Sequence, residues 1–419
     1  MNLYLLCILL ILIGNYALSS SVNRLNIRHL STQLPREFEG YYDAQHYRRS
    51  QQYLRDNTRF GMLTSTAMTI ATVVFIVAGG FSWIDTAARS CGGGPILTGL
   101  VFVGLVLLGS SLLHIPFSVY ATFVIEEHYG FNKTTPKTFA LDILKVWLLT
   151  ALIGGSVFAV VLWFFETAGP WAWLYCWCAV TAFQIFFMCI APVVIMPLFN
   201  RFVPLTDGEL KQAIEGYARS QGFAIKGVFT MDGSRRSAKS NAFFTGFGRF
   251  RRIVLFDTLI EKHSIEELVA IVGHEVGHYK KRHILQHLVI AIATNGCMFF
   301  ILSCFLNNRG LFDAFGMQHL SIYASFVFFG FLYAPIEMLI SFFSNMLSRK
   351  NEYQADRYAA ASSGRPEALI EALKKLSVDN LSNLTPHPLK VLLSYSHPPV
   401  LERIKKLRTS GHIRGAAAV

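Results

Sequence analysis

The sequence is poor in charged residues. Only 15% of its 419 residues are charged, whereas 53% are hydrophobic and the mean hydropathy is +0.40. A water-soluble chain needs a more polar surface than this, and a disordered chain needs far fewer apolar residues. The composition therefore excludes a disordered protein, and it favours a multi-pass membrane protein over two or three soluble domains.

Paired cysteine motifs are also absent. The chain has seven cysteines and no Cys-x-x-Cys sequence. All of them except Cys91 lie in apolar stretches, where we expect small buried hydrophobic side chains rather than metal ligands or disulfides. A disulfide framework is therefore excluded.

Long hydrophobic runs, in contrast, are abundant. A window of about 19 residues, the length of helix that crosses a bilayer core, identifies seven candidate spans. They are residues 3–18, 62–84, 96–125, 143–165, 171–199, 284–306 and 320–347. The first is short and ends in Ala-Leu-Ser, so a cleaved signal peptide is the alternative to a retained helix.

Basic residues gather in alternate loops. Seven arginines lie in residues 21–60, 14 lysines and arginines in 200–283, and 12 from 349 onward, whereas the intervening loops hold only Arg89 and Arg309. The positive-inside rule makes the basic side cytoplasmic and the N-terminus external. The net charge of +12 then indicates contact with anionic lipid headgroups, without a nucleic-acid partner.

These patterns predict a mainly α-helical membrane protein in four segments. Spans one to five occupy residues 1–199, a cytoplasmic segment 200–283, spans six and seven 284–348, and a C-terminal cytoplasmic segment 349–419. A small β element is expected from the runs at Gly227–Met231, 241–244 and Arg252–Phe256, with turn signals at 232–233 and 246–248. Amphipathic helices are expected after a capping box at Thr206 and Glu209, and over residues 366–376.

Residues 274–278 read His-Glu-Val-Gly-His. On a helix, His274 and His278 lie one turn apart on one face, so two imidazoles can reach one metal ion. Glu275 lies between them, where it can accept a proton from the attacking water. A capping box at Ser264 and Glu267 predicts the start of this helix, and no proline precedes the motif.

A catalytic zinc site needs a third protein ligand. The residue six positions after the motif is Ile284, so a histidine at metzincin spacing is missing, and His283 and His287 are weak candidates at the membrane edge. Glu352 and Asp356 form an i, i+4 pair on a helix predicted after span seven. We expect Glu352 to complete a His2Glu site and Asp356 to accept the N–H of a ligating histidine. A solvated acidic face is the alternative.

Further motifs extend over nearly the whole chain. They read Glu-Glu-His-Tyr-Gly-Phe-Asn-Lys-Thr-Thr at 126–135, Pro-Leu-Phe-Asn at 197–200, Asp-Gly-Ser-Arg-Arg-Ser at 232–237, Asn-Ala-Phe-Phe-Thr-Gly-Phe at 241–247, Arg-Ile-Val-Leu-Phe-Asp-Thr-Leu at 252–259 and Ser-His-Pro-Pro at 396–399. With the HExxH motif, this set resembles the type I CAAX prenyl proteases, which are membrane-embedded zinc metalloproteases. The run at 237–241 is more similar to the bacterial branch.

The resemblance implies seven helices around a water-filled chamber, with one zinc ion inside it near the cytoplasmic end. It also implies roles for individual residues. The zinc ligands would be His274, His278 and Glu352, the catalytic base Glu275, the oxyanion donor His397, and the substrate-binding residues Asn241, Ala242, Phe243 and Arg403.

The implied reaction is hydrolysis of a peptide or protein substrate, with removal of C-terminal residues after a prenylated cysteine. The alternative is a quality-control protease acting on membrane proteins without a prenyl group. A transporter would need charged residues within its spans, and few occur: Asp142, Lys145 and Glu337. We expect the bacterial inner membrane, or the endoplasmic reticulum membrane in a eukaryote, with the active site toward the cytoplasm.

Overall fold

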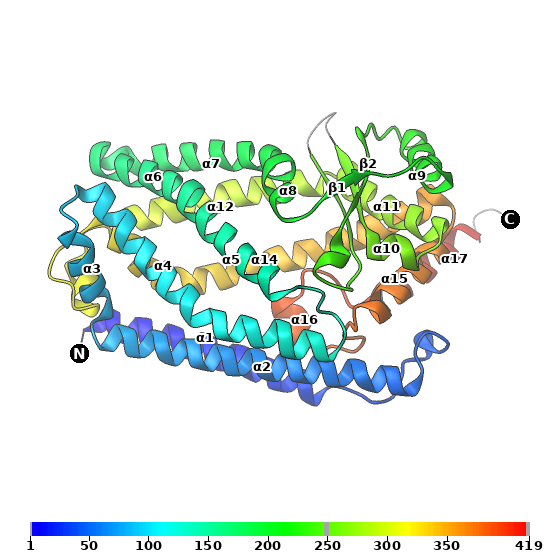
Figure 1. Ribbon diagram of the computed structural model, residues 1–419, viewed down its shortest axis with the longest axis horizontal. Helices are drawn as coiled ribbons and strands as arrows, with labels where there is room; N and C mark the ends of the chain where they lie inside the picture. Colours follow the sequence, from blue (N-terminus) through cyan, green and yellow to red (C-terminus); the bar gives the residue numbers. More distant parts are fainter. Residues whose placement is uncertain (1, 247–250, 416–419) are drawn as a thin grey trace.

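The computed structural model describes residues 2–246 and 251–415, which form an elongated, largely helical molecule (Figure 1). Within these residues, seven helices are long and apolar enough to cross a membrane, as predicted. Four of them are single helices: α1 (Leu3–Arg28), α2 (Ala44–Val77), α12 (His283–Phe305) and α14 (Ile322–Ser363). The other three are longer stretches that contain more than one helical segment. They are Pro95–Glu126, which begins with α4 (Pro95–Tyr120), Pro136–Thr167, with α5 (Pro136–Leu149) and α6 (Gly155–Thr167), and Gly169–Phe199, with α7 (Ala172–Ile190) and α8 (Met196–Phe199).

The spans are loosely packed against one another. In the most apolar part of each span, between 0% and 17% of the residues are buried within the protein. A close-packed bundle would bury far more of its side chains, because interiors are filled to crystal-like density. Helices spread around a chamber have this low burial, since their side chains face either lipid or the interior.

The second span ends earlier than predicted. Residues 62–84 were expected to form one helix, but α2 ends at Val77 and α3 (Gly80–Ser90) follows as a separate helix. Gly79 between them has φ 74°, a left-handed conformation that glycine adopts without steric cost and that a continuing helix does not allow. The run of apolar residues continues through this break, so hydropathy alone did not locate it.

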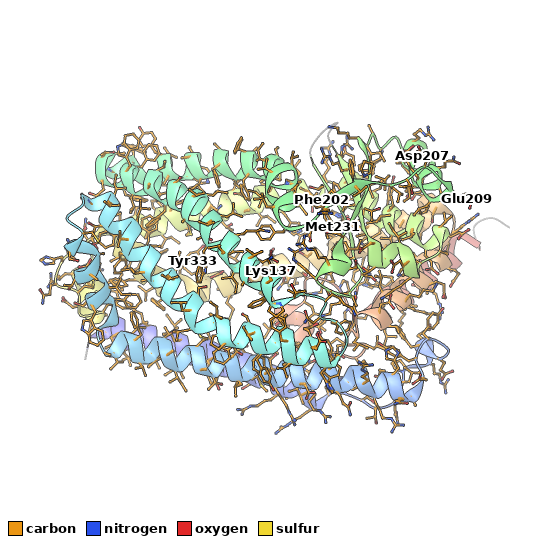
Figure 2. All side chains as sticks on the ribbon, viewed as in Figure 1. Lys137, Phe202, Asp207, Glu209, Met231 and Tyr333 are labelled. Atoms are coloured by element: carbon orange, nitrogen blue, oxygen red, sulfur yellow. The ribbon has the colours of Figure 1, made fainter. Side chains whose placement is uncertain are left out.

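The predicted β element is a four-stranded sheet in the order β1-β2-β4-β3. β2 (Gly227–Met231), β3 (Ala242–Thr245) and β4 (Arg252–Phe256) match the expected runs, and β1 (Phe202–Pro204) was not predicted. β2 and β4 are parallel and the other pairs antiparallel, with Phe202 opposite Met231 (Figure 2). β3 lies at the edge of the sheet, so one side of its backbone is available to another strand. The turn predicted at 246–248 extends beyond the described residues.

The remaining helices lie outside the candidate membrane spans. α9 (Glu209–Ser220) begins after Gly208, and no described side chain caps it, so the capping box at Thr206 is wrong. The helix predicted at 366–376 is confirmed as α15 (Pro366–Asp379). The others are the short 3-10 turns Arg36–Phe38 and Gly233–Arg235, α10 (Asp257–Lys262), α11 (Ile265–Lys280), α13 (Arg309–Ala314), α16 (Pro388–Ser394) and α17 (Val400–Gly415).

Candidate metal centre

The HExxH motif lies on α11, a 16-residue helix that starts at the predicted capping box. The Glu267 amide donates to Ser264 Oγ at 3.3 Å, and the Ser264 amide donates to Glu267 Oε2 at 3.2 Å. The same helix buries Leu268, Val272 and Val276 against the sheet and α9. The capping box and the apolar face together fix where the motif lies.

α11 packs closely against the part of α14 that extends beyond the membrane span. Gly277, within the motif, permits this approach: a Cβ there would lie 2.9 Å from Cα and 3.0 Å from the carbonyl oxygen of Ala355. Because Ala355 lies between Glu352 and Asp356, the same close contact brings both carboxylates to the histidines.

Replacing Gly277 with alanine is therefore expected to displace α14. Both clashing atoms belong to the backbone, so we expect a loss of about 1–3 kcal/mol in the free energy of unfolding, the usual cost of overpacking, together with weaker metal binding. Thermal unfolding and metal titration measure the two effects. G273A is the matched control, because its Cβ would approach the movable end of a side chain, the Tyr217 hydroxyl, at 2.9 Å. Equal effects in the two variants would contradict this explanation.

Three potential ligand atoms converge on one point. His274 Nε2 lies 3.1 Å from His278 Nε2, and Glu352 places its carboxylate oxygens 3.4 Å and 3.2 Å from these two nitrogens. All the ligand atoms lie within 4.8 Å of one another. Glu352 Oε2 is buried and has no hydrogen-bond partner among the described residues. A His2Glu set with an unsatisfied carboxylate oxygen fits a divalent metal ion.

Asp356 lies behind the first histidine, one turn beyond Glu352 on α14. Its Oδ1 is 2.8 Å from His274 Nδ1. Arg403 of α17 donates two hydrogen bonds to the same carboxylate, at 2.8 Å and 2.6 Å. Burial opposes protonation of His274, but its hydrogen bonds to Asp356 and Glu352 outweigh burial and raise its pKa to about 9. The two carboxylates therefore favour a positive charge at His274, which a metal cation would also supply.

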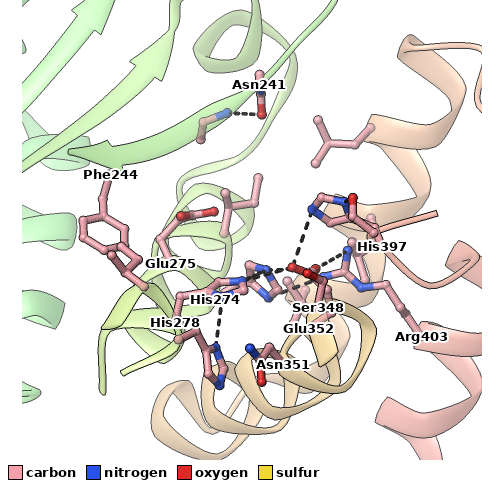
Figure 3. Close-up of a pocket in the computed structure, with 18 of the residues that line it drawn as sticks. Asn241, Phe244, His274, Glu275, His278, Ser348, Asn351, Glu352, His397 and Arg403 are labelled. Atoms are coloured by element: carbon pink, nitrogen blue, oxygen red, sulfur yellow. Dashed lines mark hydrogen bonds and ion pairs between the residues drawn. The ribbon is translucent and has the colours of Figure 1, made fainter. Parts of the chain in front are cut away.

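Glu275 borders a cavity of about 480 Å³ beside the three ligands. Figure 3 shows its carboxylate above the histidines and directed toward the open space. Burial raises the pKa of this carboxyl group above its usual range. A more basic carboxylate that points into the cavity has the properties of a general base.

The edge strand β3 forms the opposite wall of the cavity (Figure 3). The lining residues that the structure describes include Asn241, Ala242 and Phe244 but not Phe243. Neighbouring side chains of a strand point to opposite faces, and the Phe243 ring instead packs edge-on against Phe256, with ring centroids 6.3 Å apart. The Phe243 side chain therefore does not line the cavity, although it was predicted to bind substrate.

Two residues of the C-terminal segment complete the cavity wall. His397 Nε2 lies 3.5 Å from Glu352 Oε1, and its Nδ1 is hydrogen-bonded to Ser396 Oγ at 2.9 Å. Desolvation by the neighbouring cavity wall lowers the pKa of His397 and favours the neutral imidazole, although 68% of the side chain is exposed. Arg403 was predicted to contact substrate, but its side chain is only 11% exposed and its hydrogen bonds engage Asp356. The geometry favours a supporting role for it.

The segment before Asn241 is anchored by residues to which sequence reasoning gave no role. The amide of Ala238 donates to the Phe131 carbonyl at 3.0 Å. Lys239 Nζ lies 3.0 Å from Glu126 Oε2, and Tyr53 donates to the other oxygen of that carboxylate at 2.6 Å. The available signal was the motif at 126–135, which now explains how the edge strand is held to the membrane helices.

Of the alternative ligands, neither His283 nor His287 belongs to the metal-binding group found among the described residues. His283 faces the outer nitrogen of His278, at 3.1 Å, rather than the ligand side. His287 lies 3.5 Å from Ser348. The predicted set of His274, His278 and Glu352 is the one that converges.

The fold and the site together define a membrane-embedded metallopeptidase. Residues 23–201 match the CAAX prenyl protease N-terminal model, with five membrane helices, and residues 204–410 match peptidase family M48. The chain is 35% identical to the CAAX prenyl protease 1 homolog of Oryza sativa subsp. japonica, covering 89% of this chain and 90% of the relative. It is 33% identical to CAAX prenyl protease 1 of Saccharomyces cerevisiae, with coverages of 90% and 88%.

A solved structure leads to the same conclusion. The crystal structure of S. mikatae Ste24p superposes with a TM-score of 0.92 at 33% identity, and the match covers 96% of this chain and 99% of that one. The chain therefore belongs to peptidase family M48 and, within it, to the CAAX prenyl protease 1 proteins.

Several predictions are confirmed by this membership. The protein is a multi-pass membrane metalloprotease that acts on peptides or proteins, and its helices have the Ste24p-like arrangement around a membrane chamber. The transporter reading is wrong, and the quality-control alternative is not favoured. The similarity to a bacterial branch stays a prediction, because the relatives named here come from a plant and a yeast.

Proposed function

We propose that this protein is a zinc endopeptidase that cleaves near the C-terminus of prenylated proteins. The observation that carries the proposal is the convergence of His274, His278 and Glu352 within 4.8 Å at the wall of a 480 Å³ cavity. The chemistry of the donor set supports zinc, which takes three nitrogen or oxygen ligands and keeps one open position in catalytic sites. The proposed enzyme is thus a gluzincin-like peptidase, with an HExxH motif and a glutamate as the third ligand.

When bound, the metal would polarise the scissile carbonyl and make water a better nucleophile near neutral pH. Glu275 accepts the proton of the attacking water and returns it to the leaving amine. Neutral His397 donates its Nε2 proton to the oxygen on which negative charge develops, while Nδ1 accepts from Ser396. Asp356 holds His274 in the required tautomer, and Arg403 holds Asp356.

The edge strand supplies the proposed peptide site. An extended substrate can pair with the free side of β3, which gives affinity through main-chain hydrogen bonds. Asn241, the residue before that strand, lines the cavity and can donate its side-chain NH2 to a substrate backbone, while its Oδ1 accepts from the Ala242 amide at 2.9 Å. Phe244 lines the same wall and provides an apolar contact.

The prenyl specificity and the membrane orientation have separate support. The named relatives are CAAX prenyl proteases, and the apolar helices around the chamber offer lipid-like surroundings for a prenyl chain. The alternation of basic loops supports a cytoplasmic position of the metal site. The membrane is the bacterial inner membrane, or the endoplasmic reticulum if the chain is eukaryotic.

Metal analysis and peptide cleavage test the proposal together. The purified full-length protein is expected to hold about one zinc ion per chain, to lose activity on chelation and to regain it when zinc is added back. A farnesylated reporter peptide ending in a CaaX sequence should be cleaved, and the same peptide without the farnesyl group should be cleaved far more slowly. Protein without stoichiometric metal would contradict the metal site. Equal cleavage of both peptides would contradict the prenyl specificity alone.

A further inference from the structure

The two histidines of the metal centre are supported by different kinds of group. His274 Nδ1 faces the Asp356 carboxylate at 2.8 Å. His278 Nδ1 instead faces a second imidazole, with Nδ1 of His283 at 3.1 Å. The other nitrogen of His283, Nε2, lies 3.2 Å from Gln354 Oε1. His283 is only 2% exposed, so its two ring nitrogens depend on these partners.

The backbone is bent in a way that brings His283 to this position. α11 ends at Lys280 and α12 begins at His283. Arg282 between them has φ 57° and ψ 32°, the left-handed conformation that costs a non-glycine residue about 1–2 kcal/mol. The sharp turn directs the first side chain of α12 back toward α11, where the rings of His283 and His278 meet edge-on at 5.1 Å. Strained backbone of this kind persists where the surrounding structure requires it.

We propose that His283 and Gln354 are positioning residues that fix the tautomer and the orientation of His278 as a metal ligand. The inference rests on the proposed metal site. A histidine that binds metal through Nε2 carries its proton on Nδ1, so His278 Nδ1–H donates to His283 Nδ1. His283 then carries its own proton on Nε2 and donates it to Gln354 Oε1. Every donor in this chain has an acceptor, and binding of the metal determines its direction.

The hydrogen bonds from His278 through His283 to Gln354 orient His278 without adding charge. Asp356 behind His274 is anionic and neutralised by Arg403, whereas the groups behind His278 are neutral. The same hydrogen bonds join three helices, because His278 lies on α11, His283 begins α12, and Gln354 lies on α14. Since α12 and α14 both include membrane spans, these hydrogen bonds connect His278, the second ligand, directly to the membrane helices.

Zinc affinity of the full-length protein in detergent, measured by chelator competition, tests the proposal. H283L removes the acceptor, and Q354L removes the end of the chain. Each is expected to weaken zinc binding by about 10–100-fold, as is typical when the partner of a ligand is lost. H283N keeps an acceptor oxygen close to the position of Nδ1, so it should retain most of the affinity. H287L is the matched control: it lies one turn along α12 and lines the same cavity, but outside the hydrogen-bonded chain.

A second measurement separates positioning from general packing. Tm is recorded for each variant with and without zinc. A positioning role reduces the gain in Tm on zinc binding in H283L and Q354L, whereas a packing role lowers Tm of the apo and zinc forms equally. Three results would overturn this inference but not the proposed function. They are wild-type zinc affinity in both H283L and Q354L, zinc binding by H283N that is as weak as by H283L, and a loss of zinc affinity in H287L equal to that in H283L. A wild-type protein that binds no zinc would overturn the proposed function and this inference with it.

Discussion

Replacing Glu275 with glutamine is expected to lower kcat by about 10²- to 10⁴-fold, the usual contribution of a general acid–base group, while metal content stays the same. The amide has nearly the shape of the carboxylate but cannot accept a proton. The ligand atoms belong to His274, His278 and Glu352, so this substitution leaves the metal-binding group intact. KM should change little, because the peptide is expected to be held mainly by main-chain hydrogen bonds to β3.

The experiment combines zinc analysis with steady-state cleavage of the farnesylated reporter. E266Q is a suitable control, because Glu266 lies in the first turn of the same helix and is exposed to solvent. That variant should keep both its metal and its activity. Near-normal turnover by E275Q would refute the assignment of the base, and loss of zinc from E275Q would show that the carboxylate has a ligand role that the geometry does not provide.

The parts of the fold that the sequence predicted depend on signals within short windows. Hydropathy over one helix length was sufficient for the seven spans. The capping box at Ser264 and Glu267 predicted the start of α11, and both of its hydrogen bonds are present. The i, i+4 spacings of the two metal-site helices predicted which side chains share a face, because helical periodicity fixes this locally.

Features that depend on backbone conformation or on distant packing were not predicted. The break at Gly79 interrupts an apolar run, and Gly208 rather than Thr206 precedes α9. The role of His283 follows from the left-handed conformation of Arg282 and from a contact with Gln354, 71 residues away. Sequence reasoning weighed His283 only as a metal ligand, because spacing shows that it lies near the motif but not which side of His278 it faces.

The Glu352 carboxylate, which is distant in sequence from the HExxH motif, is the part of the site that the sequence supported least. The geometry, in contrast, supports it strongly. Glu352 was predicted as the third ligand from its place on a helix after the last span, with a solvated acidic face as the alternative. It is 5% exposed, and one of its oxygens is unsatisfied among the described residues. Burying a carboxylate is costly unless it is paired, and Arg403 Nη1 lies 3.4 Å from Oε2 without a hydrogen bond to it. A cation between Glu352 and the two imidazoles would lower that cost further, which is consistent with a metal ion at this position.

Replacing Glu352 with glutamine should therefore have the opposite outcome to E275Q. The amide oxygen is a much poorer ligand than a carboxylate oxygen, so we expect zinc affinity to fall by more than about 100-fold, beyond the 10–100-fold range for groups that only support a ligand. Activity should be lost at ordinary zinc concentrations and recover partly when zinc is in excess, whereas added zinc should not rescue E275Q. E337Q is the matched control, since Glu337 lies on the same helix α14 but outside the ligand group. If E352Q kept wild-type zinc affinity, the third ligand would have to be a different residue, and the carboxylate would need another explanation for its burial beside two histidines.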